Sequence, residues 1–225
     1  MTIEAIRYER KYVVDHSIAE VRSLVRIHPA HFVSAYPDRR VNNVYLDTVA
    51  LGAYQANAAG VGTRTKIRIR WYGPLFGDVA TPFLEIKGRL GDVGTKTRHP
   101  LPPLSTHRGI DARSLEGAVR NLPLGPDEAS LCAGTRPVLL TTYLREYWVT
   151  YDGRFRLTID SEIGYGGASL RDARALLLDR HLVVELKYER DDALSAEVVA
   201  SRFPLRLSRS SKFARGLERL LPLGS

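Results

Sequence analysis

The chain has 225 residues, 44% of them hydrophobic, and carries 33 Lys and Arg against 25 Asp and Glu, a formal net charge of +8. This length and apolar content allow a substantial core, and we expect one domain spanning residues 1–225. The single cysteine, Cys132, excludes an internal disulfide. The positive charge indicates a polyanionic partner, such as nucleic acid, polyphosphate, a nucleotide or an anionic membrane surface.

Targeting signals are not apparent in the sequence. The first residues, MTIEAIRYERKYVV, lack the apolar stretch of a signal peptide, and no run of about 18 apolar residues indicates a transmembrane segment. Together with the low cysteine content, this predicts a cytoplasmic protein. A membrane partner and the oligomeric state are left open by the sequence.

Strand signals and short helix signals follow one another along the chain. Strands are predicted over residues 6–14, 41–48, 63–73, 82–90, 94–101, 138–151, 154–163 and 182–189. Gly91-Asp92 and Asp152-Gly153 indicate hairpin turns. Helices are predicted from the Ser17–Glu20 capping box to about residue 28, between residues 48 and 60, around 115–119 and 128–131, and within the tail 208–221.

One of these strands carries four cations at alternate positions. In TRTKIRIRWYG, residues 63–73, Arg64, Lys66, Arg68 and Arg70 share one face of the predicted strand. Neighbours on one face lie roughly 7 Å apart, where two unit charges repel by about 2.4 kcal/mol at an effective dielectric near 20. The row must therefore be solvated, paired with acids or arranged to receive an anion.

The other strands repeat this alternation of charged and apolar faces. Either an open antiparallel sheet with helices on its apolar side or a closed barrel with a charged lumen would satisfy it. For one strand alone, a solvated face is the simpler explanation. Across the strands, however, Lys and Arg outnumber the carboxylates, chiefly Glu9, Glu85, Asp160 and Glu185. That ratio favours a site where cations hold phosphate oxygens and one or two carboxylates hold a divalent metal.

Ten segments in sequence order carry a family resemblance: RYERKYVV, HPAHF, VNNVYLDT, KIRIRWYG, FLEIKGR, TKTRHPL, YLREYW, FRLTID, LVVELKY and SSKFARG. The chain resembles the catalytic domain of the vacuolar transporter chaperone (VTC) family, polyphosphate polymerases of the triphosphate tunnel metalloenzyme (CYTH) superfamily. The resemblance implies an α+β fold. Its centre would be an eight-stranded antiparallel β-barrel, the triphosphate tunnel, with flanking helices and a C-terminal helix at one tunnel end.

The resemblance also implies roles for individual residues. Catalytic roles fall on Lys11, Arg68, Arg70, Arg156 and Lys187. Phosphate-binding roles fall on Lys66, Lys87, Lys96, Arg98, Tyr143, Arg145, Ser211 and Lys212. A divalent metal, Mn²⁺ or Mg²⁺, would be held by Glu185 with Glu9. Many tunnel enzymes begin with a Glu-x-Glu-x-Lys motif, which reads Arg7-x-Glu9-x-Lys11 here, and this departure favours one tightly held metal over two.

The implied activity is metal-dependent phosphoryl transfer from ATP, or another nucleoside triphosphate, to a growing polyphosphate chain. Two alternatives remain on the same scaffold. With water as the acceptor the site would be a triphosphatase, and without catalysis it would be a module that binds polyphosphate, pyrophosphate or another polyanion. Nucleic-acid binding is not expected, because Trp71 and Trp148 fall on the apolar faces of their strands.

Overall fold

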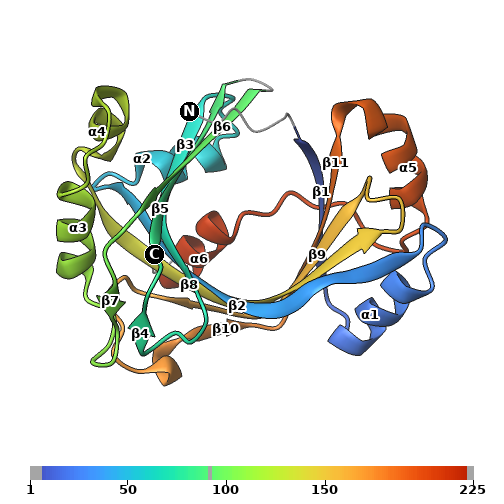
Figure 1. The fold of residues 1–225 in the computed structure, drawn as a ribbon, viewed down its shortest axis with the longest axis horizontal. Coiled ribbons are helices and arrows are strands. Elements are labelled where there is room, and N and C mark those ends of the chain that lie inside the picture. Colours follow the sequence, from blue (N-terminus) through green and yellow to red (C-terminus); the bar gives the residue numbers. More distant parts are fainter. Residues whose placement is uncertain (1–6, 91–92, 222–225) are drawn as a thin grey trace.

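The protein is a mixed α+β fold built on one large antiparallel sheet, seen in a computed structural model that describes residues 7–90 and 93–221 (Figure 1). The strands follow the order β1-β11-β9-β8-β2-β3-β5-β6, and β10 adds to β9. Their bounds are β1 Arg7–Val14, β2 Phe32–Thr48, β3 Arg64–Tyr72, β5 Phe83–Leu90, β6 Val93–Pro100, β8 Thr135–Thr150, β9 Arg156–Gly166, β10 Leu177–Asp179 and β11 Leu182–Glu189. A separate pair consists of β4 Asp78–Val79 and β7 Leu104–Ser105.

Six α-helices accompany the sheet in the described part of the chain. They are α1 Ile18–Arg26, α2 Gly52–Ala58, α3 Ala112–Arg120, α4 Pro126–Cys132, α5 Ala193–Ser201 and α6 Lys212–Leu220. Short 3₁₀ turns lie at Ala173–Ala175 and Arg190–Asp192. In the described ranges, no helix is long and apolar enough to cross a membrane.

The sheet is curved but not closed, so the predicted eight-stranded barrel is wrong. β1 pairs with β11 and β6 pairs with β5, and no pairing joins β1 to β6 within residues 7–90 and 93–221. Closure would require these edge strands to exchange backbone hydrogen bonds. Figure 1 shows the sheet curving around α6, with β1 and β6 as its two separate edges. The alternation along each strand is the same for open and closed sheets, so closure was expected only from the family resemblance.

The convex face of the sheet carries the apolar side chains, as predicted. Ile67, Ile69 and Trp71 of β3 are buried in a cluster that α3 covers with Leu115 and Val119. A second cluster lies between the other half of the sheet and two helices, α1 and α5. The capping box that begins α1 is confirmed, whereas α5 lies in a segment where the sequence analysis predicted no helix.

The concave face holds the charged side chains and, at one end, α6 (Figure 1). Phe213 and Leu217 of this helix pack in a third cluster with Leu139 and Tyr165. A Cβ at Gly216 would stand 2.6 Å from Tyr165 and 2.8 Å from Leu139, so only glycine allows this approach. The predicted terminal helix therefore exists and contacts the sheet closely. The predicted turn at Gly91-Asp92 lies outside the described residues.

Candidate functional site

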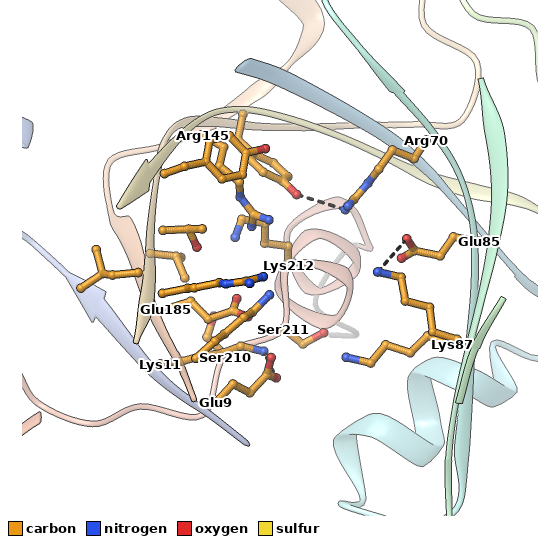
Figure 2. A pocket seen from close by; sticks show the side chains of 18 of the residues that line it. Glu9, Lys11, Arg70, Glu85, Lys87, Arg145, Glu185, Ser210, Ser211 and Lys212 are labelled. Atoms are coloured by element: carbon orange, nitrogen blue, oxygen red, sulfur yellow. Dashed lines mark hydrogen bonds and ion pairs between the residues drawn. The ribbon is translucent and has the colours of Figure 1, made fainter. Parts of the chain in front are cut away.

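A cavity of about 660 Å³ occupies the concave face (Figure 2). Among the described residues, twelve Lys and Arg side chains line it against three Glu side chains, so its charge is strongly positive. The fifteen are Glu9, Lys11, Arg64, Lys66, Arg68, Arg70, Glu85, Lys87, Lys96, Arg98, Arg145, Arg156, Glu185, Lys187 and Lys212. All six lysines of the sequence are among them, although the chain has 27 arginines. Lysine side chains are therefore found only at this cavity, whereas most arginines lie elsewhere.

Every residue to which the resemblance assigned a role lines this cavity, Tyr143 and Ser211 included. The two carboxylates assigned to metal, Glu9 and Glu185, lie on its wall with Lys11 and face Lys87 across the cavity (Figure 2). The side chain of Arg7, the position at which the predicted metal site departs from the Glu-x-Glu-x-Lys motif, lies outside the described part of the structure.

Glu85 organises one wall through three cations. Arg68, Glu85 and Arg98 stand opposite one another on β3, β5 and β6, because the register of the two strand pairs aligns them. The Glu85 carboxylate, 1% exposed, pairs with Arg68, with Arg98 Nε at 3.2 Å and with Lys96 Nζ at 3.4 Å. Burial works to raise the pKa of Glu85, but the charges of Arg68, Arg70 and Lys96 hold it well below the usual carboxyl range. Glu85 is thus an ionised anchor that fixes these cations.

The next position along the same strands is a row of lysines. Lys66, Lys87 and Lys96 are directly opposite one another on β3, β5 and β6. Lys66 Nζ lies 3.0 Å from Ser211 Oγ, at the start of α6. Burial, and then the charges of Lys11, Arg64 and Lys87, lower the pKa of Lys66 to about 7. Like charges directly opposite one another are unfavourable in a sheet, so this row is suited to an anion.

We expect proton uptake when inorganic tripolyphosphate binds at pH 8. Lys66 is then largely neutral in the free protein, and a bound anion raises its pKa and restores its charge. Calorimetric titration in two buffers with different ionisation enthalpies measures this uptake, which Lys66→Met should reduce and Arg120→Met, on the exposed end of α3, should leave unchanged. Equal uptake in Lys66→Met and wild type would contradict the assignment.

The same pKa predicts how Lys66 affects stability without ligand. The folded-state pKa of about 7 is below the unfolded value of 10.5, so folding opposes protonation of Lys66. This penalty is complete below pH 7 and disappears as the pH rises toward 10.5. Lys66→Met should therefore stabilise the free protein more at pH 6 than at pH 9.

Arg70 lies at the floor of the cavity and is held by uncharged partners. Arg70, 6% exposed, donates from Nε to Asn43 Oδ1 at 2.7 Å and from Nη2 to the Tyr143 hydroxyl at 3.3 Å. Burial works to raise the pKa of Tyr143, but the charges of Arg145 and Arg70 lower it. Arg70 is thus positioned by two neutral hydrogen-bond acceptors. Sequence reasoning missed Asn43, although its place in VNNVYLDT, opposite Arg70 on β3, gives it this role.

Asp160 ties the sheet to α6. It is fully buried and accepts two hydrogen bonds from Arg145, at 2.6 and 2.7 Å, and one from Lys212 Nζ at 2.5 Å. Burial works to raise the pKa of Asp160, but the charges of Arg145 and Lys212 lower it. Asp160 is not among the site residues predicted from the sequence. Its function in the structure is to position two cavity cations.

Alternating carboxylates and ammonium groups form the opposite wall, on β1 and β11. In the strand register, Lys11 stands opposite Glu185 and Glu9 opposite Lys187. Lys11 Nζ lies 2.6 Å from Glu9 Oε1, and Lys187 Nζ lies 3.1 Å from Glu185 Oε1. Burial works to raise the pKa of Glu185, but Lys187, Lys11 and a hydrogen bond with the Glu9 carboxyl group hold it well below its usual range. Glu9 and Glu185 therefore lie close together on this wall, beside Lys11 and Lys187 (Figure 2).

Comparison with known proteins adds a family and a fold. The family described as the VTC domain matches residues 6–221. A candidate adenylate cyclase from Vibrio parahaemolyticus has a similar structure, with a TM-score of 0.52, 14% identity, and coverage of 92% of this chain and 95% of that one. A protein from Pyrococcus horikoshii aligns with a TM-score of 0.50 and 14% identity, over 95% of this chain and 99% of that one. No curated protein matched the sequence.

Proposed function

The chain belongs to the VTC domain family, and we propose on that basis that it is a polyphosphate polymerase, which transfers phosphoryl groups from ATP to a growing phosphate chain. The observation that supports this most is the cavity, where twelve cations face three carboxylates and all six lysines gather. A cavity with this charge attracts highly charged anions and holds several phosphate groups at once.

A divalent metal, Mn²⁺ or Mg²⁺, fits the pair Glu9 and Glu185. Within the described ranges, no cluster of three or more His, Cys, Asp or Glu could hold a metal by itself. Mg²⁺ is typically bound by one or two carboxylates together with phosphate oxygens of the substrate. The closeness of Glu9 and Glu185, on the paired strands β1 and β11, suits a metal that arrives with the triphosphate. When bound, such a metal would neutralise charge on the phosphate oxygens.

The chain's own residues supply positioning and charge stabilisation. Arg68 and Arg70 are held by Glu85 and Asn43, so their guanidinium groups are pre-oriented before a ligand arrives. Donors fixed in this way stabilise the charge that develops on a transferred phosphoryl group without reorganising during the reaction. Cations on both walls can align the donor and the end of the acceptor chain for in-line attack.

Two other functions use the same cavity. A triphosphatase would deliver the phosphoryl group to water, and a binding module would retain the polyanion without reaction. The open edge between β1 and β6 favours neither the triphosphatase nor the binding module. Access of water to the reacting phosphate depends on how much of the cavity the bound substrate occupies.

The test is an incubation of the purified protein with ATP and either Mn²⁺ or Mg²⁺. Gel electrophoresis follows long phosphate chains and a colorimetric assay follows free phosphate. We expect the wild type to form long phosphate chains with either metal. Arg70→Met should form about a hundredfold less product, and Arg120→Met on α3 should behave as wild type. Free phosphate without chains would identify a triphosphatase. Salt-dependent polyphosphate binding without either product would identify a binding module.

A further inference from the structure

Three tyrosines and one arginine form a second chemical environment in the cavity, which we call the tyrosine cluster: Tyr36, Tyr72, Tyr147 and Arg39. All three tyrosines line the cavity. The Arg39 guanidinium lies 5.8 Å from the ring centroid of Tyr36 and 5.9 Å from those of Tyr72 and Tyr147. Tyr36 and Tyr147 meet edge to face, with centroids 5.8 Å apart. The residues come from three adjacent strands, β8, β2 and β3.

The cluster lies at the end of the cavity away from α6. This helix packs on Leu139 and Tyr143 of β8, and Tyr147 lies four residues beyond Tyr143, roughly 13 Å along an extended strand. On β3, Lys66 contacts Ser211 before α6, and Tyr72 lies six residues farther along. Both strands therefore lead from the cations near α6 to the tyrosines.

The tyrosines adjoin the phosphate-binding residues directly. Tyr72 follows Arg70 by two positions on β3, and Tyr147 follows Arg145 by two positions on β8, so each is the next side chain on the concave face. A ligand whose phosphates contact Arg70 and Arg145 thus presents its next chemical group to the tyrosine cluster.

Exposure shows that these rings are not core residues. Tyr36 is 60% exposed and Tyr72 is 39% exposed, whereas Tyr143, deeper on the same face, is 2% exposed. Leaving large rings open to solvent forgoes the stabilisation of burial. Exposed aromatic faces beside a guanidinium are instead suited to stacking on a flat heterocycle.

We propose that the tyrosine cluster is the nucleobase subsite of the phosphoryl donor. This rests on the proposed function, in which the donor is a nucleoside triphosphate. The base lies against the tyrosine rings and Arg39 at the mouth, and the triphosphate extends toward Arg70, Arg145 and the cations near α6. The subsite distinguishes a nucleotide from inorganic tripolyphosphate, which carries the same phosphates without a base.

The test compares ATP with inorganic tripolyphosphate in calorimetric titrations of the full chain at fixed salt and metal. We expect the double variant Tyr36→Leu/Tyr147→Leu to bind ATP about tenfold more weakly, since stacking of one base contributes on that scale. Tripolyphosphate affinity should be unchanged. Tyr147→Phe, which keeps the ring, should bind ATP as wild type does.

A matched control is Tyr151→Leu, because Tyr151 is 89% exposed and is not among the residues that line the cavity. Equal ATP affinity in the double variant and wild type would overturn the subsite, and so would an equal loss for ATP and tripolyphosphate, which would indicate a structural role. A wild type that binds neither ligand would overturn it as well. A selective loss for ATP in a protein without turnover would support the subsite and reject only the polymerase.

Discussion

Glu185→Gln is expected to reduce metal-dependent turnover at least a hundredfold while the protein still folds. Removing a residue that only supports a metal ligand lowers metal affinity or activity about 10- to 100-fold. Glu185 is proposed as the ligand itself, so its removal should have a larger effect. The substitution keeps the shape of a buried side chain, 7% exposed, and removes its charge. The pKa of Glu185 is held well below the usual carboxyl range, so the wild-type side chain is charged at neutral pH.

Turnover of ATP measured over a range of Mn²⁺ concentrations tests this prediction, with circular dichroism to confirm folding. Glu197→Gln is the matched control, because Glu197 on α5 also pairs with a basic residue, Arg10, but is not among the residues that line the cavity. A Glu185→Gln variant with wild-type turnover would show that Glu185 holds no metal needed for the reaction.

Asp160→Asn is expected to cause the largest loss of stability, about 3 kcal/mol in the free energy of unfolding at pH 7. The variant leaves Arg145 and Lys212 beside a buried amide that cannot compensate two positive charges. The folded-state pKa of Asp160 is below its unfolded value near 3.9, so the carboxylate stabilises the protein above that pH. This contribution is lost as the pH falls through the folded-state pKa, and the difference between variant and wild type should shrink in acid.

Chemical denaturation at pH 7 and at pH 3 measures both effects. Asp172→Asn is the control, because Asp172 pairs with Arg174 at the surface, where such pairs contribute little. Tripolyphosphate should stabilise Asp160→Asn more than wild type, since the anion replaces the missing negative charge beside Arg145 and Lys212. Equal stability of Asp160→Asn and wild type would show that Asp160 does not hold these cations.

Much of the site could be predicted from local patterns. Alternation along each strand separates the charged cavity residues from most core residues, because side chains of an extended chain point to opposite faces, although Trp148 and Leu157 of the apolar faces also line the cavity. Even the pair Arg145 and Asp160 follows from counting outward from the Asp152-Gly153 turn, since the two residues are equally distant from it. These features depend on neighbours in sequence or on one hairpin.

The remaining features depend on contacts that no local pattern records. Lys66 and Ser211 are separated by 145 positions in the sequence, and only the packing of α6 brings them together. The tyrosine cluster depends on register irregularities in β2, around Tyr36, which change the face that each following side chain occupies. Whether β1 and β6 meet is a property of the whole sheet's curvature. Long-range geometry, rather than residue type, set the limit of prediction.

The confinement of all six lysines to the cavity gives the protein a built-in chemical reporter. Amine-reactive reagents modify lysines and the amino terminus but not arginines. Apart from the terminus, labelling therefore monitors the cavity and no other surface. Mass spectrometry of labelled peptides can follow occupancy by any anion, including one taken from a cell extract, before that anion has been identified.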